Sequence, residues 1–106
     1  MGESRISKDI RKAINESGRA RIVRNNVGMD LEHGVRYGCG LGSPDFIGVL
    51  RDGRSFCIEC KAIRGHASFN QLAWWHAARK WGVLGGIARS VDEAMALLDA
   101  ADGGAR

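Results

Sequence analysis

The sequence of 106 residues lacks the features that mark several classes of protein. It has one proline, three cysteines and no apolar run near the roughly 18 residues of a membrane-spanning helix. The polar start, MGESRISKDIRKA, has no apolar stretch typical of a secretory signal. An odd number of cysteines argues against a disulfide framework and fits free thiols in a reducing compartment. We therefore expect a cytoplasmic protein without a membrane segment.

The composition is that of an ordinary globular domain, with 44% apolar and 26% charged residues. We expect one domain over residues 1–106, with a flexible tail at 101–106. The sequence contains sixteen Lys and Arg residues and twelve Asp and Glu residues, which gives a formal net charge of +4. Such a basic balance permits a polyanionic partner, for example nucleic acid, without requiring one.

Hydrophobic periodicity predicts the order helix, strand, hairpin, helix, strand, helix. An Asp-Gly turn at residues 52–53 joins two strand patterns, DFIGVL and SFCIECKA. Ser68 and Gln71 form a capping box that opens a helix to about residue 81. We interpret the Gly-rich residues 28–43 as a long loop, with a short extended piece inside it as the alternative.

Three charged residues interrupt strand patterns that otherwise indicate a sheet core. Glu59 and Lys61 are two residues apart on one strand and project to the same face. If Asp45, at the start of the neighbouring strand, also lies on that face, two carboxylates and an ammonium converge. A divalent cation such as Mg²⁺ or Mn²⁺ removes the repulsion, and a lysine can help to deprotonate a water. We predict a metal site suited to phosphodiester hydrolysis, with a structural ion network as the alternative.

Other motifs have weaker chemical interpretations. Cys57 and Cys60 form a C-x-x-C pattern, but strand residues three apart point to opposite faces, which disfavours a zinc site. The segment GCGLGS precedes a strand rather than a helix, so we expect no nucleotide cofactor. Among Trp74, Trp75 and Trp81, we expect one in the core, while another could meet a dimer partner or stack on a base.

The charged motif also carries a family resemblance. Pro44-Asp45, thirteen residues and then Glu59-Cys60-Lys61 resemble the core of the PD-(D/E)XK nucleases. A wider set of segments resembles the VRR-NUC family, the virus-type replication-repair nucleases: RNN before Gly28, GSPDFIGVL, IECKA, Ser68 and Gln71 followed by Trp74, and ARSVDEA. The resemblance implies a restriction-endonuclease-like α/β fold, with a mixed sheet of about four strands flanked by helices.

The same resemblance implies an activity and its partners. Members of the family are DNA endonucleases that depend on Mg²⁺ or Mn²⁺. The small standalone members come largely from bacteriophages and are associated with homodimers that cut branched DNA, such as four-way junctions. This chain would then be a standalone member whose partners are DNA and a second copy of itself.

Position by position, the resemblance assigns Asp45 and Glu59 as metal ligands, together with the backbone carbonyl of Cys60. Lys61 would position the attacking water, and Gln71 would face the same site. We expect DNA contacts from the end of the first strand, the Gly-rich loop and the start of the next helix: Arg24, Asn25, Asn26, Arg36, Tyr37 and Ser68.

One departure from the family concerns a glutamate in the first turn of the first helix. Ser7 occupies that register here, with Glu3, Asp9 and Glu16 as the acids on or near this helix. Whether a fourth acidic ligand is present, and whether a second metal is well held, therefore stays open. Two other functions also stay open: a nuclease of the same core that acts on flaps or linear duplex, and a DNA-binding module that does not cleave.

Overall fold

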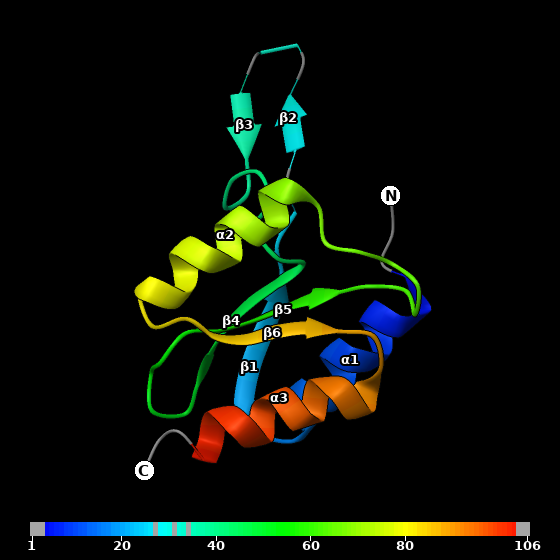
Figure 1. The fold of residues 1–106 in the computed structure, drawn as a ribbon, viewed down its shortest axis with the longest axis vertical. Helices are drawn as coiled ribbons and strands as arrows, with labels where there is room; N and C mark the ends of the chain where they lie inside the picture. The colour runs from blue at the N-terminus through cyan, green and yellow to red at the C-terminus, as the bar shows by residue number, and fades with distance from the viewer. Residues whose placement is uncertain (1–3, 27, 31, 34, 104–106) are drawn as a thin grey trace.

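The computed structural model describes residues 4–26, 28–30, 32–33 and 35–103, with the side chains of 28–30 and 35–37 outside the description. The elements follow in the order α1 (Arg5–Glu16), β1 (Ala20–Arg24), β2 (Gly28–Asp30), β3 (Val35–Tyr37), β4 (Phe46–Leu50), β5 (Phe56–Cys60), α2 (Phe69–Lys80), β6 (Leu84–Ala88) and α3 (Val91–Gly103) (Figure 1). Within the described residues, no helix combines the length and the apolar character that crossing a membrane requires.

Four strands form the central sheet in the order β1-β4-β5-β6. β4 is antiparallel to both β1 and β5, whereas β6 is parallel to β5 and is reached through α2. α1 and α3 lie on one face of this sheet and α2 lies on the other (Figure 1). The expected α/β fold, a mixed four-strand sheet flanked by helices, is confirmed.

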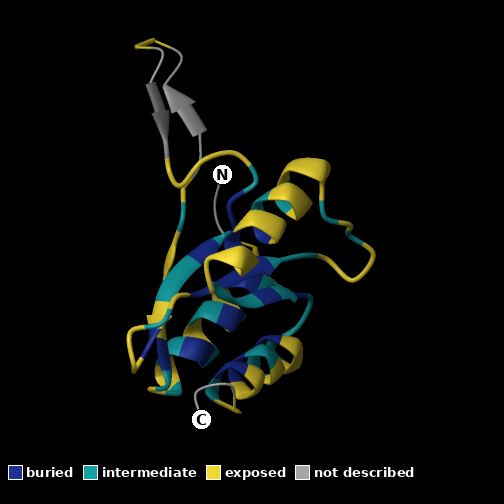
Figure 2. Cartoon of the chain, turned by 60° about the vertical axis from the view of Figure 1, so that its left-hand side comes forward, coloured by how far each residue is buried: buried dark blue, intermediate teal, exposed yellow. Residues whose placement is uncertain are grey.

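The hydrophobic core lies between the sheet and the pair α1–α3. Ile10 and Ile14 of α1, and Phe46, Phe56 and Ile58 of the sheet, are all fully buried there. The helical residues are spaced at one turn and the strand residues alternate, so each element buries a single face. Each such side chain contributes about 1.5–3 kcal/mol on burial. Figure 2 shows the result, with buried positions inside and exposed positions on the outer sides of the helices.

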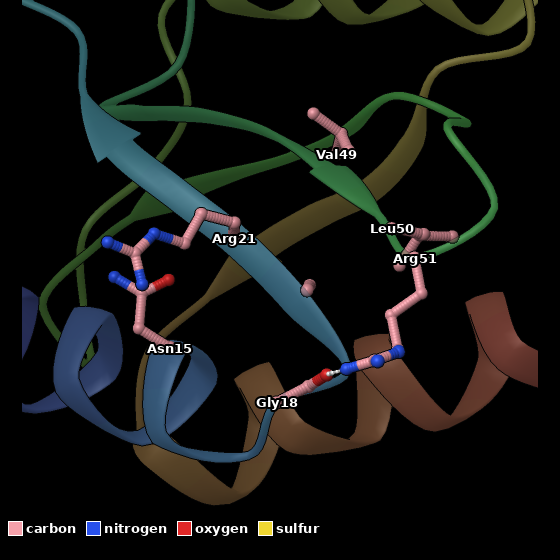
Figure 3. Close-up of a pocket in the computed structure, with 7 residues that line it drawn as sticks. Asn15, Gly18, Arg21, Val49, Leu50 and Arg51 are labelled. Carbon is pink, nitrogen blue, oxygen red and sulfur yellow. Dashed lines mark hydrogen bonds between the residues drawn. The ribbon is translucent and has the colours of Figure 1, made fainter.

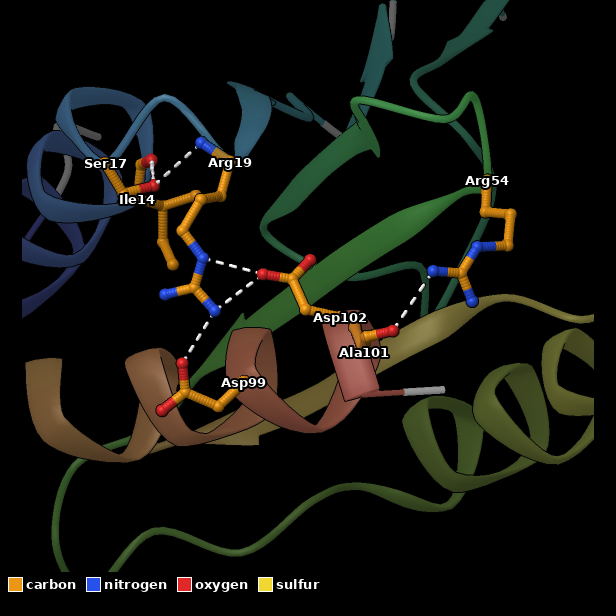
Figure 4. Close-up of polar contacts among 7 residues, drawn as sticks. All are labelled: Ile14, Ser17, Arg19, Arg54, Asp99, Ala101 and Asp102. Carbon is orange, nitrogen blue, oxygen red and sulfur yellow. Dashed lines mark hydrogen bonds and ion pairs between the residues drawn. The ribbon is translucent and has the colours of Figure 1, made fainter. Parts of the chain in front are cut away.

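The last turn of α3 replaces the first half of the expected tail. Residues 101–103 are helical, which corrects the prediction of a flexible tail from residue 101. Ala101 is buried in the core. Arg19 holds this turn, because its Nη2 atom lies 2.6 Å from both Asp99 Oδ1 and Asp102 Oδ2 (Figure 4). An ion pair between residues so distant along the chain leaves no local pattern in the sequence.

The Gly-rich segment contains a hairpin where the sequence indicated mainly loop. β2 and β3 pair antiparallel, with Gly28 opposite Tyr37 and Asp30 opposite Val35. The hairpin stands apart from the central sheet and projects away from the body of the molecule (Figure 1). Strands of three residues are too short to show an alternating pattern, so periodicity could not predict them.

β1 is an outer strand of the sheet, and a side chain caps its free edge. The Asn15 amide accepts the N–H of Ile22 at 2.8 Å and donates to the carbonyl of Ile22 at 3.0 Å. It thus satisfies both backbone groups as a neighbouring strand would. A strand edge blocked in this way cannot pair with another chain at Ile22.

We expect Gly85→Ala to lower the free energy of unfolding by about 2–5 kcal/mol. Gly85 has a φ of +101°, and a Cβ there would lie 1.9 Å from the carbonyl oxygen of Cys57. Gly53→Ala is the matched control, because Gly53 has a φ of +91° and open space around it. The control should lose only the about 1–2 kcal/mol that a residue with a Cβ costs at a positive φ. Urea unfolding measures both variants, and equal losses would contradict the prediction.

Candidate active site

The register of the sheet brings the two carboxylates of the motif together. In the antiparallel pair β4–β5, Phe46 lies opposite Ile58, so Asp45 and Glu59 are the next opposed residues. Opposed residues of antiparallel strands project from the same face. Because Phe46 and Ile58 face the core, Asp45 and Glu59 face the side of α2. Lys61 follows on that side, two residues after Glu59.

Two hydrogen bonds fix this pair of carboxylates. The N–H of Asp45 donates to Glu59 Oε1 at 3.1 Å, and the N–H of Cys60 donates to Asp45 Oδ2 at 2.8 Å. Each carboxylate therefore accepts a backbone N–H from the chain segment that carries the other. Glu59 is buried and Asp45 is half-buried. The two acids are held in place by the sheet itself.

Gln71 and Lys61 complete the cluster around Glu59. Gln71 Nε2 donates to Glu59 Oε2, and Lys61 Nζ lies 3.8 Å from the same oxygen. Gln71 Oε1 also accepts the N–H of Ser68 at 2.9 Å, while Ser68 Oγ accepts the N–H of Gln71 at 3.2 Å. This is the capping box that the sequence predicts, and it fixes the start of α2 next to Glu59.

The electrostatics of the cluster favour a cation. Burial is the main cause that raises the pKa of Glu59, to about 8, and the hydrogen bond and charge of Asp45 add to the effect. The Lys61 ammonium opposes it but does not restore an ordinary value. A divalent cation held between the two carboxylates would offset their repulsion, and oxygen ligands of this kind suit Mg²⁺ or Mn²⁺.

Within the described part of the chain, the acids of α1 are not part of the cluster of Asp45 and Glu59. Asp9 lies 3.8 Å from Arg5 on the exposed side of α1, and Glu16 is exposed in the last turn. Ser7 is buried and its Oγ accepts a hydrogen bond from Ser4. Glu3 lies outside the described residues. Those residues also hold no group of three or more His, Cys, Asp or Glu arranged for a metal.

Asn25 clamps the loop that leads to Asp45. Its Nδ2 donates to Ser43 Oγ and to the carbonyl of Pro44, both at 2.8 Å, and its Oδ1 accepts the N–H of Cys39 at 3.1 Å. Its backbone N–H donates to the carbonyl of Asp45 at 2.7 Å. Because both ends of the amide are occupied, the geometry favours a positioning role for this side chain over the expected DNA contact.

The other expected DNA contacts come from the end of β1 and the residues after it, from β3 and from the start of α2. Arg24 is exposed at the end of β1, Asn26 is exposed two residues later, and Ser68 is the exposed N-cap of α2. Arg36 and Tyr37 belong to β3, but their side chains lie outside the described residues. All of these contacts stay predictions.

Arg89 holds the loop after Lys61, a role that no sequence motif indicated. Arg89 Nη2 donates to the carbonyl of Gly65 at 2.9 Å, and the N–H of Lys61 donates to the carbonyl of Ala88 at 3.0 Å. These bonds tie the end of β6 to the segment that carries the lysine. The partners of Arg89 lie in a distant loop, so no spacing rule in the sequence could have found them.

The cysteines and tryptophans follow their expected geometry. Cys57 is buried on the α2 side of β5, whereas Cys60 packs against the core on the other face. Their opposite directions agree with the argument against a zinc site. Trp75 is buried and stacks under the Arg79 guanidinium, while Trp81 is 89% exposed.

Comparison with known proteins gives a structural likeness. A solved structure described as a VRR_NUC domain matches with a TM-score of 0.65 and 19% sequence identity, covering 90% of this chain and 91% of that chain. No family model matches the sequence, and no curated protein matches it. At this identity the likeness shows the fold, and it agrees with the resemblance of the sequence motifs.

In the metal-free protein, we expect Glu59 to make stability depend on pH. The folded state keeps the proton of Glu59 up to a pKa of about 8, whereas the unfolded chain loses it near 4.5. The stabilisation is complete below the lower value and lost above the higher one. Between them, the free energy of unfolding should fall by up to about 1.4 kcal/mol per pH unit relative to Glu59→Gln. Urea unfolding in EDTA measures this difference, and a pH-independent difference would contradict the prediction.

We expect Asn25→Ala to loosen the position of Asp45. The loop loses three side-chain hydrogen bonds, so the amide of Cys60, which donates to Asp45, should exchange its hydrogen faster. Asn15→Ala is the control, because it removes two side-chain hydrogen bonds to Ile22 of β1 but none to the loop before Asp45. Native-state hydrogen exchange measures both, and equal effects on Cys60 would show only a global loss of stability.

Proposed function

We propose that this chain is an Mg²⁺- or Mn²⁺-dependent endonuclease that hydrolyses DNA phosphodiester bonds, with a preference for branched DNA such as four-way junctions. The observation that carries the proposal is the cluster of Asp45, Glu59 and Lys61 at one end of the sheet. The fold likeness to a VRR_NUC domain supports it. The preference for branched DNA and a homodimeric state rest on the sequence resemblance.

The donor set of the cluster fits a hard divalent cation. Asp45 and Glu59 would hold it through carboxylate oxygens, and the carbonyl of Cys60 would be the third protein ligand. When bound, the cation would supply positive charge against the negative charge that develops on the attacked phosphate. The backbone N–H groups of Asp45 and Cys60, which donate to the Glu59 and Asp45 carboxylates, keep both carboxylates in place for that role.

Lys61 is the residue best placed to orient the attacking water. Its ammonium lies 3.8 Å from Glu59 Oε2, so it is anchored beside the carboxylates while keeping donors for a water and a phosphate oxygen. Gln71 has a different role, because its amide already bonds Glu59 and Ser68. We assign it to the orientation of Glu59 rather than to a contact with phosphate.

Cleavage of end-labelled four-way junctions tests this function. The wild type should cut with Mg²⁺ or Mn²⁺ and be inactive in EDTA. Asp45→Asn and Lys61→Ala should lower the single-turnover rate by about 10²–10³-fold or more. Asp45→Asn weakens the binding of the cation, and Lys61→Ala removes a positive charge beside the attacked phosphate. Lys80→Ala, at the exposed end of α2, is the matched lysine control and should keep the wild-type rate.

Junction, flap and linear duplex substrates, compared side by side, separate the alternatives. Equal rates on all three would reject a preference for branched DNA and leave a less selective nuclease. If wild type and Lys61→Ala both bind junctions and neither cuts them with Mg²⁺ or Mn²⁺, the chain is a DNA-binding module and the endonuclease proposal is wrong. Analytical sedimentation of the 11.5 kDa chain tests the homodimer.

A further inference from the structure

We propose that the side of the molecule formed by α1 and β1 is a second contact surface for DNA, which binds the phosphate backbone away from the cut bond. This inference rests on the proposed function for the identity of its ligand. The surface, called the basic edge below, consists of cationic side chains from α1, β1 and the residue after β4: Lys8, Arg11, Lys12, Arg21, Arg24 and Arg51.

Adjoining hollows run along the basic edge. One follows α1, a second follows β1 as far as Arg24, and a third lies between Gly18 and Arg51. Asn15 and Arg21 line all of these hollows, so they form one continuous surface. Figure 3 shows Arg21 beside Asn15, and Arg51 across the strand with its Nη1 donating to the carbonyl of Gly18 at 2.7 Å.

The basic edge is closed to one kind of partner. A peptide or a second copy of the chain could extend the sheet by pairing with the outer side of β1. The Asn15 amide already occupies both backbone groups of Ile22 on that side. A ligand along this edge must therefore be recognised by side chains, and most of those side chains are cationic. A polyanion fits this requirement better than an added strand does.

The charge of the molecule is distributed unevenly around this edge. α3 carries four acids and no Lys or Arg along its sequence VDEAMALLDAADG. α1 carries the opposite balance in RISKDIRKAINE, with four basic residues and two acids. One of those acids, Asp9, is paired with Arg5 at 3.8 Å. Even with Arg19 beside Asp99 and Asp102, the field of the protein therefore favours a polyanion on the α1 side over the α3 side.

The basic edge ends at the same end of the sheet as the carboxylate cluster, with Arg24 and the two carboxylates projecting from opposite faces of the sheet. Arg24 ends β1 opposite Phe46, the residue after Asp45. From Ala20 to Arg24 the strand spans about 13 Å, at about 3.3 Å per residue. Each DNA strand carries a phosphate about every 3.4 Å along its axis, so the edge has room for about four phosphates beyond the site of cutting. DNA lying in the site would reach this surface by passing around the end of β1, the outer strand of the sheet.

Neutralising the basic edge tests the inference. The double variant Lys12→Gln/Arg21→Gln removes two exposed charges, so the slope of log Kd against log salt should fall by about 1.4–1.8. Affinity for a fluorescent four-way junction should fall at least about tenfold at low salt. Fluorescence anisotropy in EDTA measures binding without cleavage, and circular dichroism confirms the fold. Arg21→Lys keeps the charge and should keep the slope.

A variant of equal net charge serves as the control. Ala96→Glu/Ala100→Glu also lowers the net charge by two, but on the exposed side of α3. Its salt slope should match the wild type and its affinity should change by less than about threefold. Equal losses in both double variants would mean that only net charge matters, and an unchanged slope in the basic-edge variant would mean that the edge makes no contact. Either result overturns the inference.

The same measurements separate this inference from the proposed function. If the wild type neither binds nor cuts DNA, the proposed function fails together with the basic edge. If the wild type cuts DNA and Lys12→Gln/Arg21→Gln binds it normally, only the basic edge is wrong. If that variant changes the sedimentation of the protein but not its DNA affinity, the edge contacts a second copy of the chain, and the inference is again wrong.

Discussion

The repulsion between Asp45 and Glu59 across the β4–β5 ladder is the constraint on which the site depends. A sheet that places two carboxylates opposite each other on one face is destabilised unless something offsets their charge. The structure offsets part of it with two backbone N–H donors, the Gln71 amide and the Lys61 ammonium. The pKa of Glu59 nevertheless stays near 8, so a further positive charge would stabilise the folded cluster.

The surroundings of the cluster keep it rigid. Asn25 fastens the loop before Asp45, and Gly42 lets that loop approach α2 closely, because a Cβ at Gly42 would lie 2.2 Å from the carbonyl oxygen of Asn70. On the other side, the Ser68–Gln71 capping box fixes the helix start beside Glu59. The carboxylates lie on or next to strands, and their neighbours are tied to the same strands. A site built in this way needs little rearrangement to bind an ion.

Local patterns in the sequence predicted the parts of this arrangement that depend on local chemistry. Alternation along residues 55–62 places Glu59 and Lys61 on one face, and the Asp-Gly turn places a neighbouring strand within reach of Asp45. The Ser68 capping box follows from spacing in the same way. The clamp at Asn25 and the helical turn at residues 101–103 depend on contacts between distant segments, and the strands of the β2–β3 hairpin are too short to show a period. No periodicity or motif encodes such contacts.

The distribution of charge separates binding from catalysis. Without a cation, the Asp45–Glu59 pair supplies no positive charge, so it cannot attract DNA to the protein. The Lys61 ammonium is engaged with Glu59 and balances negative charge of the pair. Attraction must then come from charges outside the cluster, and the basic side chains along α1 and β1 end at Arg24, at the same end of the sheet. In this arrangement affinity and rate depend on different residues, since the basic edge determines where DNA lies and the carboxylates determine whether it is cut.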